Sequence, residues 1–241
     1  MKKYVFKWIL LSVALIGIVA LFFVFNNKKN KEVVNDVTVN VINSHSPFVS
    51  KEMIVQHLRN DSIVFLGIAA ERIDLSQMET SVENNPYVEY ADCYFSLNGG
   101  LTIDISQRTP ILRVQPEGTT GYYIDRTGVQ FPLSPMYTPN VKIATGHIQN
   151  DLNKKLYTFT SYVNQSTFWK PFIEQIFVRP NGDIVFTTQI GGHEVNIGDN
   201  ERLPQKLDKL EKFYKRASSN LGWEVYREIN LKFKDQVICS K

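Results

Sequence analysis

The sequence is poor in cysteine and histidine, with two cysteines and four histidines in 241 residues. So few cysteines exclude a disulfide-built scaffold and any zinc site made from two or more cysteine pairs. Lys and Arg outnumber Asp and Glu by only 27 to 24, which does not indicate a nucleic-acid-binding protein. Hydrophobic residues make up 43% and charged residues 21%, a composition that indicates a folded chain rather than a disordered one.

Catalytic signatures are also missing from the sequence. It contains no G-x-S-x-G motif, no phosphate loop and no G-x-G-x-x-G motif. The histidines are scattered, and no two of them have the i, i+4 spacing of a zinc-protease helix. We therefore predict no catalytic residue, no metal site and no cofactor. Cys93 and Cys239 are predicted to be reduced and packed as small hydrophobic side chains, and a disulfide between them is the alternative.

One long hydrophobic run, Trp8–Phe25, contains 18 residues without a charged side chain. At about 1.5 Å per residue, a helix of this length spans about 27 Å, close to the thickness of a bilayer core. A cleaved signal peptide is the alternative, but Asn26-Asn27-Lys28 makes a poor cleavage site. Lysines flank the run on both sides, so charge leaves its orientation open. The residues predicted to anchor this transmembrane helix are Trp8, Ile9, Leu10, Leu21, Phe22 and Phe25.

The chain on either side of this run divides by composition into four further segments. Residues 1–7 are predicted to form a short cytoplasmic tail, and the lysine-rich residues 26–35 a juxtamembrane linker. Residues 36–110 read as a β-α-α-β-β module. Ser50 and Asp74 are the predicted N-caps of its two helices. Alternation of apolar and polar or aromatic-rich residues predicts its strands over residues 37–41, 87–97 and 101–106.

Residues 111–241 are predicted to form a β-rich C-terminal domain with one antiparallel sheet flanked by helices, so that the fold class of the chain is α+β. Hairpins are predicted at two turns, Asp125–Gly128 and Asn181-Gly182. Apolar residues at helical spacing predict two helices, with Leu152, Leu156, Phe159 and Val163 on the first and Leu203, Leu207, Leu210 and Tyr214 on the second. A final strand is predicted, with Ile229, Leu231 and Phe233 on one face and Asn230, Lys232 and Lys234 on the other.

This arrangement resembles the FtsQ/DivIB cell-division family, and three passages carry the resemblance. The first is Pro86-Tyr87-Val88 with the later segment from Leu101 to Pro110, which resembles the passage that closes the family's POTRA module. The second is the segment from Tyr122 to Pro132, similar to the family's Y-x-V-D-x-x-G-x-x-F hairpin, followed by Val141 to Gly146. The third is the segment from Ile229 to Phe233, at the place of the family's terminal V-D-L-R-Y strand. Departures are Gln107 for Glu, Asn230 for Asp, Lys232 for Arg and Phe233 for Tyr.

The resemblance implies a non-enzymatic, single-pass protein of the divisome. Its N-terminus would lie inside, and its C-terminal part would lie outside the cytoplasmic (inner) membrane, on the periplasmic side, at the division septum. Its partners would be small bitopic proteins of the FtsB and FtsL type, which control septal cell-wall synthesis. No nucleic acid and no small-molecule substrate is expected.

The final strand is the predicted partner-binding site, because a strand at a sheet edge presents unpaired backbone groups to which a partner strand can add. The resemblance implies that Lys232 pairs with an acidic partner residue and that Phe233 supplies apolar contact. The alternative is that the apolar side chains of this strand belong to the core. The predicted site residues are Ile229, Asn230, Leu231, Lys232, Phe233, Lys234 and Gln236.

Two other functions remain open at this point. A β-α-α-β-β module also occurs in envelope-assembly and secretion proteins, where it binds unfolded strands, but those proteins continue into a long membrane barrel. A membrane-anchored cell-wall enzyme would require a nucleophile or a metal constellation, and the sequence offers none that we recognise.

Overall fold

The structure is a computed structural model that describes residues 13, 15–20, 33–42, 47–220, 226–234 and 236–241. The residues described from the predicted 8–25 helix are helical. None of the helices in the described part of the chain is both long and apolar enough to cross a bilayer. Trp8, Ile9, Leu10, Leu21, Phe22 and Phe25 lie outside the described residues. Packing divides the chain into two compact units, residues 1–107 and 108–241.

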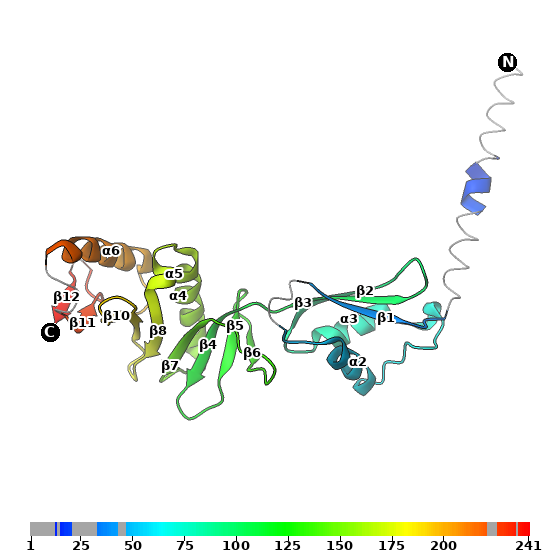
Figure 1. The fold of residues 1–241 in the computed structure, drawn as a ribbon, viewed down its shortest axis with the longest axis horizontal. Coiled ribbons are helices and arrows are strands. Elements are labelled where there is room, and N and C mark those ends of the chain that lie inside the picture. The colour runs from blue at the N-terminus through cyan, green and yellow to red at the C-terminus, as the bar shows by residue number, and fades with distance from the viewer. Residues whose placement is uncertain (1–12, 14, 21–32, 43–46, 221–225, 235) are drawn as a thin grey trace, which may run out of the picture. The chain divides into compact units, whose positions relative to one another are not determined.

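The first unit is a three-stranded sheet with helices α2 and α3 on one face (Figure 1). The sheet order is β1-β3-β2, with β1 parallel to β3 and β2 antiparallel to it. This confirms the predicted β-α-α-β-β order. The elements are β1 (Val37–Ile42), α2 (Lys51–Asn60), the 3-10 helix η1 (Ala70–Arg72), α3 (Leu75–Glu83), β2 (Val88–Phe95) and β3 (Leu101–Gln107).

Both predicted helix caps of the first unit are present. The Ser50 hydroxyl accepts from the backbone N–H of Met53 at 3.3 Å, and the Asp74 carboxylate accepts from that of Gln77 at 3.0 Å. These bonds pair N–H groups that the first turn of a helix leaves without an internal partner. Beneath the helices, side chains from all three strands form one apolar core. Val34 belongs to it and is fully buried, so the packing of this unit begins before β1.

Gln107, at the position where the family pattern has Glu, is a buried link in the first unit. Its Oε1 accepts from the backbone N–H groups of Phe48 (2.8 Å) and Val49 (2.9 Å), which precede α2. The side chain is only 6% exposed, and its Nε2 has no partner among the described residues. One amide oxygen therefore satisfies two buried donors and fixes the chain that leads into α2.

The second unit contains a nine-stranded sheet of order β12-β11-β10-β9-β8-β7-β4-β5-β6. Helices α4, α5 and α6 lie together on one of its faces (Figure 1). The strands are β4 (Pro110–Pro116), β5 (Tyr122–Asp125), β6 (Gln130–Pro132), β7 (Lys142–Gly146), β8 (Ile173–Val178), β9 (Ile184–Thr188), β10 (Glu194–Gly198), β11 (Glu228–Asn230) and β12 (Ile238–Ser240). The helices are η2 (Asn150–Leu152, a 3-10 turn), α4 (Asn153–Gln165), α5 (Trp169–Phe172) and α6 (Leu203–Asn220).

The prediction of an antiparallel sheet in this unit is wrong, because the sheet is mixed. The pairs β4–β7, β7–β8 and β10–β11 are parallel. Helices α4 and α5 connect β7 to β8, and α6 connects β10 to β11. A helix that crosses the sheet face returns the chain to the end where it started, so the two strands that it joins run parallel. The sequence predicted the two long helices, but not that the strands on either side of each connection are neighbours in the sheet.

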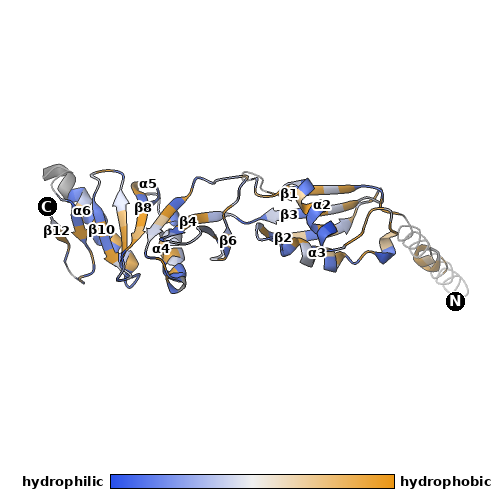
Figure 2. Cartoon of the chain, turned by 90° about the horizontal axis from the view of Figure 1, so that it is seen from below, coloured by the Kyte–Doolittle hydropathy of each residue, from blue (hydrophilic) through white to orange (hydrophobic). Residues whose placement is uncertain are grey.

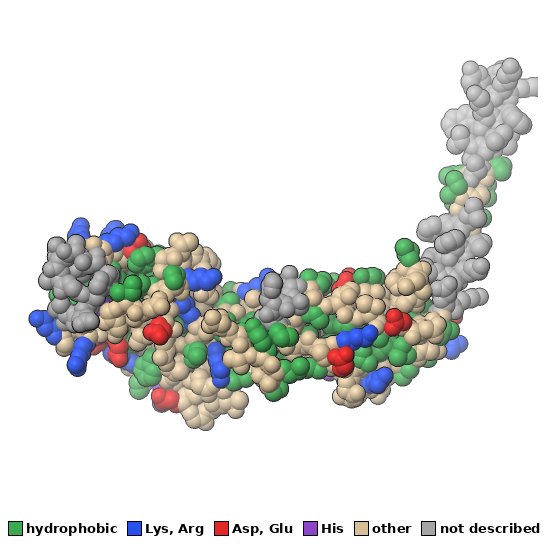
Figure 3. Space-filling model, in the orientation of Figure 1, with side chains coloured by type: hydrophobic (Ala, Val, Ile, Leu, Met, Phe, Trp, Pro, Cys, Tyr) green, Lys and Arg blue, Asp and Glu red, His purple; other side chains and the backbone are tan. Residues whose placement is uncertain are grey.

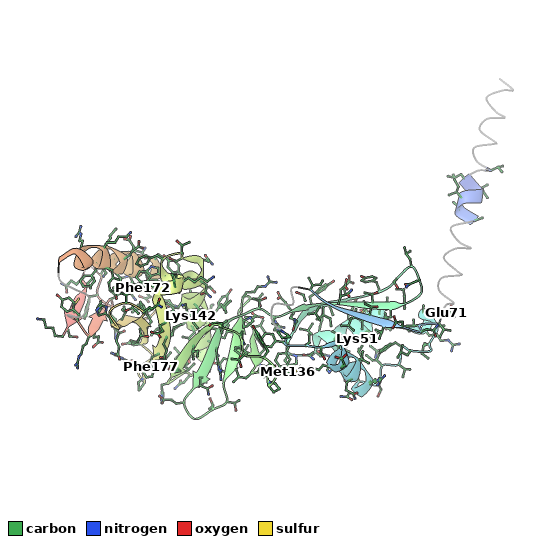
Figure 4. The ribbon with its side chains drawn as sticks, viewed as in Figure 1. Lys51, Glu71, Met136, Lys142, Phe172 and Phe177 are labelled. Carbon is green, nitrogen blue, oxygen red and sulfur yellow. The ribbon has the colours of Figure 1, made fainter. Side chains whose placement is uncertain are left out.

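The described helices of this unit cover one face of the nine-stranded sheet. The predicted apolar stripes of α4 and α6 are confirmed, and Leu156, Phe159, Leu207 and Leu210 are fully buried against the strands. Phe172, at the end of α5, is 8% exposed. Phe177 lies on β8, points away from the helices and is 39% exposed (Figure 4). Apolar and polar residues alternate along several strands (Figure 2), as one covered and one open face require.

Gln107→Ala removes the acceptor of two buried N–H groups. We expect the free energy of unfolding to fall by about 2–3 kcal/mol, since each buried donor left unpaired is costly. Urea unfolding of the full chain, followed by the fluorescence of residues in the first unit, measures the change. Gln107→Glu is the matched control because it keeps an acceptor at the same place. A loss below about 0.5 kcal/mol for the alanine variant would show that other groups replace the amide oxygen.

Candidate partner-binding edge of the second unit

The C-terminal edge of the nine-stranded sheet is formed by β11, the loop after it and β12, which we call the terminal hairpin (residues 228–240). β11 pairs with β10 on one side and with β12 on the other. β12 is the last strand in the sheet order, so among the described strands it pairs on one side only. The sheet edge therefore lies in the predicted C-terminal segment, but the strand predicted to form it is wrong. The edge is β12, and β11 lies inside the sheet.

The predicted strand over residues 229–233 is shorter in the structure. Ile229 and Leu231 are fully buried, as core residues, while Phe233 is 50% exposed and does not share their face. The strand ends at Asn230, whose side-chain oxygen accepts from the backbone N–H of Lys232 at 3.0 Å. Such a bond two residues along the chain favours a turn over a continued strand. Ile229 and Leu231 are thus unavailable to a partner.

Lys209 on α6 holds the loop of the terminal hairpin. Its Nζ donates to the backbone oxygens of Phe233 (2.8 Å), Lys234 (3.2 Å) and Gln236 (2.9 Å). A protonated ammonium group has three N–H donors, so this one side chain can satisfy all three carbonyls. Lys209 was not predicted as a site residue, because a lysine on the polar side of a helix gives no signal of its target. The side chains of Phe233, Lys234 and Gln236 remain exposed around this clamp.

Lys232, the predicted partner of an acidic residue, already has an acidic partner within the unit. Its Nζ lies 2.8 Å from Oδ2 of Asp183, at the turn between β8 and β9. Its aliphatic stem runs over Gly198, where an added Cβ would lie 2.9 Å from Cγ of Lys232. Burial raises the pKa of Asp183, but hydrogen bonds from Lys232, Asn181 and Asn196 outweigh it and leave that pKa below its ordinary value. The pair therefore fixes the start of the hairpin loop to the sheet.

A polar hollow of about 340 Å³ lies beside this ion pair. Its basic and acidic side chains largely neutralise one another, since Lys206 contacts Asp199 at 2.9 Å and Lys232 contacts Asp183. Within the described ranges of the chain, no group of three or more His, Cys, Asp or Glu side chains could hold a metal ion. Cys93 and Cys239 are both free. The charged side chains around the hollow thus form ion pairs that stabilise the fold.

Comparisons with known proteins agree with this two-unit architecture. The family model described as FtsQ/DivIB, C-terminal related, matches residues 109–240, more than half of the chain. The chain belongs to the FtsQ/DivIB family. A POTRA-like domain model matches residues 32–106. The chain is also 25% identical over 204 residues to "Cell division protein FtsQ" of Salinibacter ruber (strain DSM 13855 / M31), an alignment that covers 75% of each protein.

The residues that carry the FtsQ/DivIB pattern at the start of the second unit form one buried electrostatic link. Asp125 is fully buried, and its carboxylate accepts from Arg108 Nη1 (2.8 Å), from the N–H and hydroxyl of Thr127 and from the N–H of Val129. Gly128 has φ +89°, a conformation that the turn requires and that glycine adopts without strain. The family pattern at these positions therefore has a structural role.

The hydrogen bonds of Asp125 make the second unit sensitive to acid. Burial raises its pKa, yet the bonds from Thr127, Arg108 and Val129 together lower it below the ordinary value. A carboxyl group whose pKa is lower in the folded chain stabilises the fold above its unfolded-state pKa of about 4. This contribution is lost as the pH falls through the folded-state pKa.

For Asp125→Asn we expect a loss of about 1–3 kcal/mol at pH 7, because Arg108 then lacks its buried ionic partner. We also expect a smaller further loss than in the wild type when the pH is lowered from 6 to 3. Urea unfolding across this pH range provides the measurement, with Asp74→Asn, an exposed helix cap, as the control. Equal pH dependence in wild type and Asp125→Asn would contradict the assignment.

Lys209→Met keeps a long side chain but removes the donors that hold the terminal hairpin. We expect the opening free energy of the β12 amides to fall by about 1–3 kcal/mol, with little change in global unfolding. Native-state hydrogen exchange of residues 231–240 measures this opening. Lys212→Met is the matched control, because Lys212 lies on the same helix and pairs only with Asp208 at 2.7 Å among its described neighbours. Equal exchange in both variants would exclude the clamp.

Proposed function

We propose that the chain is a non-enzymatic scaffold of the divisome, held in the cytoplasmic membrane by one N-terminal helix. The FtsQ/DivIB family match and the name of the Salinibacter ruber relative support a role in cell division. We place the transmembrane helix at residues 8–25 and the cytoplasmic tail at residues 1–7. The linker, the POTRA-like domain of residues 36–110 and the C-terminal domain of residues 111–241 would lie on the periplasmic side, at the septum.

The terminal hairpin is the proposed recruitment site for bitopic partners of the FtsB and FtsL type. The observation that carries this proposal is that β12 has a neighbouring strand on one side only in the part of the chain that the structure describes. An extended partner segment can add to such an edge through backbone hydrogen bonds, while side chains determine register. We therefore propose β12 and the exposed loop as the site, with Ile229, Asn230 and Leu231 as its support.

Exposed side chains of the terminal hairpin indicate what the partner segment contains. Phe233 and Ile238 are 50% and 43% exposed, and both can lose apolar surface to a partner. Lys and Arg side chains gather on the face shown in Figure 3, at the end of the second unit that carries α6. An extended segment with apolar and acidic residues therefore complements this edge. Because partner and chain would share one membrane, their effective concentration is high, and a modest intrinsic affinity suffices for recruitment.

The double variant Phe233→Ala/Ile238→Ala tests this site without touching the core. We expect it to weaken binding of the FtsB-type ectodomain by at least about tenfold, since truncation of an exposed apolar anchor costs ~1–2 kcal/mol. Calorimetric titration of the full-length chain in detergent measures the affinity. Hydrogen exchange of the complex should show new protection at residues 238–240, as strand addition requires.

Leu97→Ala is the matched control, because Leu97 is 94% exposed at the β2–β3 turn, far along the sequence from the hairpin. Cells depleted of the chain should form filaments without constrictions. The wild type and Leu97→Ala should restore division, and Phe233→Ala/Ile238→Ala should not. Unchanged affinity of the double variant would reject the hairpin site, and normal division after depletion would reject the divisome role itself.

A further inference from the structure

The sheet of the first unit has two edges, and the β2 edge is closed by the unit's own side chains. The backbone N–H of Ala91 donates to Glu83 Oε1 at 3.2 Å, and that of Cys93 donates to Glu79 Oε1 at 2.9 Å. Both glutamates lie on α3, which packs against β2. Two central donors of β2 are therefore occupied, and a further strand cannot pair with them unless both carboxylates leave.

No described strand or side chain covers the second half of the β1 edge. The backbone oxygen of Asp36 accepts from the N–H of Leu101 on β3, so the backbone groups of Asp36 face β3. The N–H and C=O groups of successive residues in a parallel strand alternate in direction, so those of Val37, Val39 and Val41 point away from β3. The N–H of Val37 donates to Asp36 Oδ1 (2.8 Å), and its C=O accepts from Lys51 Nζ (2.7 Å), which extends to β1 from α2 (Figure 4). Among the described residues, nothing bonds to the outward groups of Val39 and Val41.

The uncovered face of this sheet is anionic. Its three strands contain Glu89, Asp92 and Asp104 and no Lys or Arg. Asp92 and Asp104 stand directly opposite each other on β2 and β3, an arrangement that is unfavourable for two like charges. Hydrogen bonding to Asp104, followed by burial and the charges of Asp104 and Asp92, raises the pKa of Tyr94, in agreement with a negative field over this face.

Asp104 is held in place at the centre of this face. Its two oxygens accept from Asn40 Nδ2 (2.8 Å) and from the Tyr94 hydroxyl (3.1 Å), and each retains capacity for a further donor. Tyr90 and Tyr94 are 58% and 40% exposed on either side of Asp92. Neighbouring strands lie about 4.8 Å apart, so a strand added beside β1 would lie about 10 Å from β3. A lysine or arginine on it can extend over Asn40 and reach Asp104.

We propose that the β1 edge of the first unit is a docking surface for an extended, Lys- or Arg-containing segment of a partner protein. The segment adds as a strand beside Val39 and Val41, and its basic side chains lie over the face that carries Asp104. Closure of the opposite edge by Glu79 and Glu83 gives this unit a single open edge among its described strands. This site belongs to the first unit and the terminal hairpin to the second, so the proposal does not depend on the function proposed for the hairpin.

The test uses the full-length chain in a neutral detergent and a fluorescein-labelled peptide of eight alternating threonine and lysine residues. Val39→Pro removes the outward N–H while keeping an edge conformation that proline tolerates. We expect this variant to weaken peptide binding, measured by anisotropy, by about tenfold. Asp92→Asn/Asp104→Asn should weaken it by about fivefold, because it removes both charges without changing shape. Glu71→Gln, which removes an exposed charge outside the sheet, and Phe233→Ala/Ile238→Ala should bind as the wild type does.

Several outcomes overturn the proposal. These are equal binding of an alternating threonine–glutamate peptide, unchanged affinity in a folded Val39→Pro chain, and loss of binding only in Phe233→Ala/Ile238→Ala. Self-association that Val39→Pro abolishes in the absence of peptide would identify a second copy of the chain as the occupant instead. If Val39→Pro lowers the unfolding temperature strongly, a peptide N-methylated at alternate residues replaces it. Undiminished binding of that peptide would exclude strand addition.

Discussion

Burial of one face of the nine-stranded sheet beneath α4, α5 and α6 is the interaction on which the second unit depends. The apolar stripes of α4 and α6 are fully buried against residues from β4 and from β7 to β11. A sheet covered on one face only must leave its other face and its two outer strands in solvent. The edge that we propose to bind a partner follows from this architecture, because one-sided covering leaves the outer strands of the sheet exposed.

The outer strands of the two sheets differ in whether side chains of the same unit occupy their free backbone groups. In the first unit, Glu79 and Glu83 occupy donors of β2, so one edge is closed by carboxylates from the neighbouring helix. In the second unit, Lys209 occupies carbonyls of the hairpin loop but leaves β12 itself uncovered. A free edge exposes a protein to unwanted pairing, so each edge that is left open requires a reason. The recruitment that we propose would supply that reason for β12, and our further inference would supply it for β1.

Local patterns in the sequence predicted most elements of the first unit, because Ser50, Asp74 and the alternation in β1 and β3 act over a few residues. They also predicted the hairpins and both long helices of the second unit. They did not predict β12, whose three residues are too few to show a period. Local patterns also led to the wrong prediction of an antiparallel sheet, because pairing between β10 and β11 joins residues separated by the whole of α6. The end of β11 depends on Asn230, and the loop after it is held by Lys209. A contact of the latter kind has no signature in a single sequence.

Lys209 gives the terminal hairpin a second attachment that differs in kind from its strand pairing. A partner that is anchored in the membrane and bound to β12 would exert a pulling force on this edge whenever the two proteins move relative to each other. Part of that tension would pass from the loop carbonyls of residues 233, 234 and 236 through one ammonium group into α6, whose apolar stripe is buried in the core. We therefore expect the hairpin to resist peeling from the sheet better than it would with only its three residue pairs to β11.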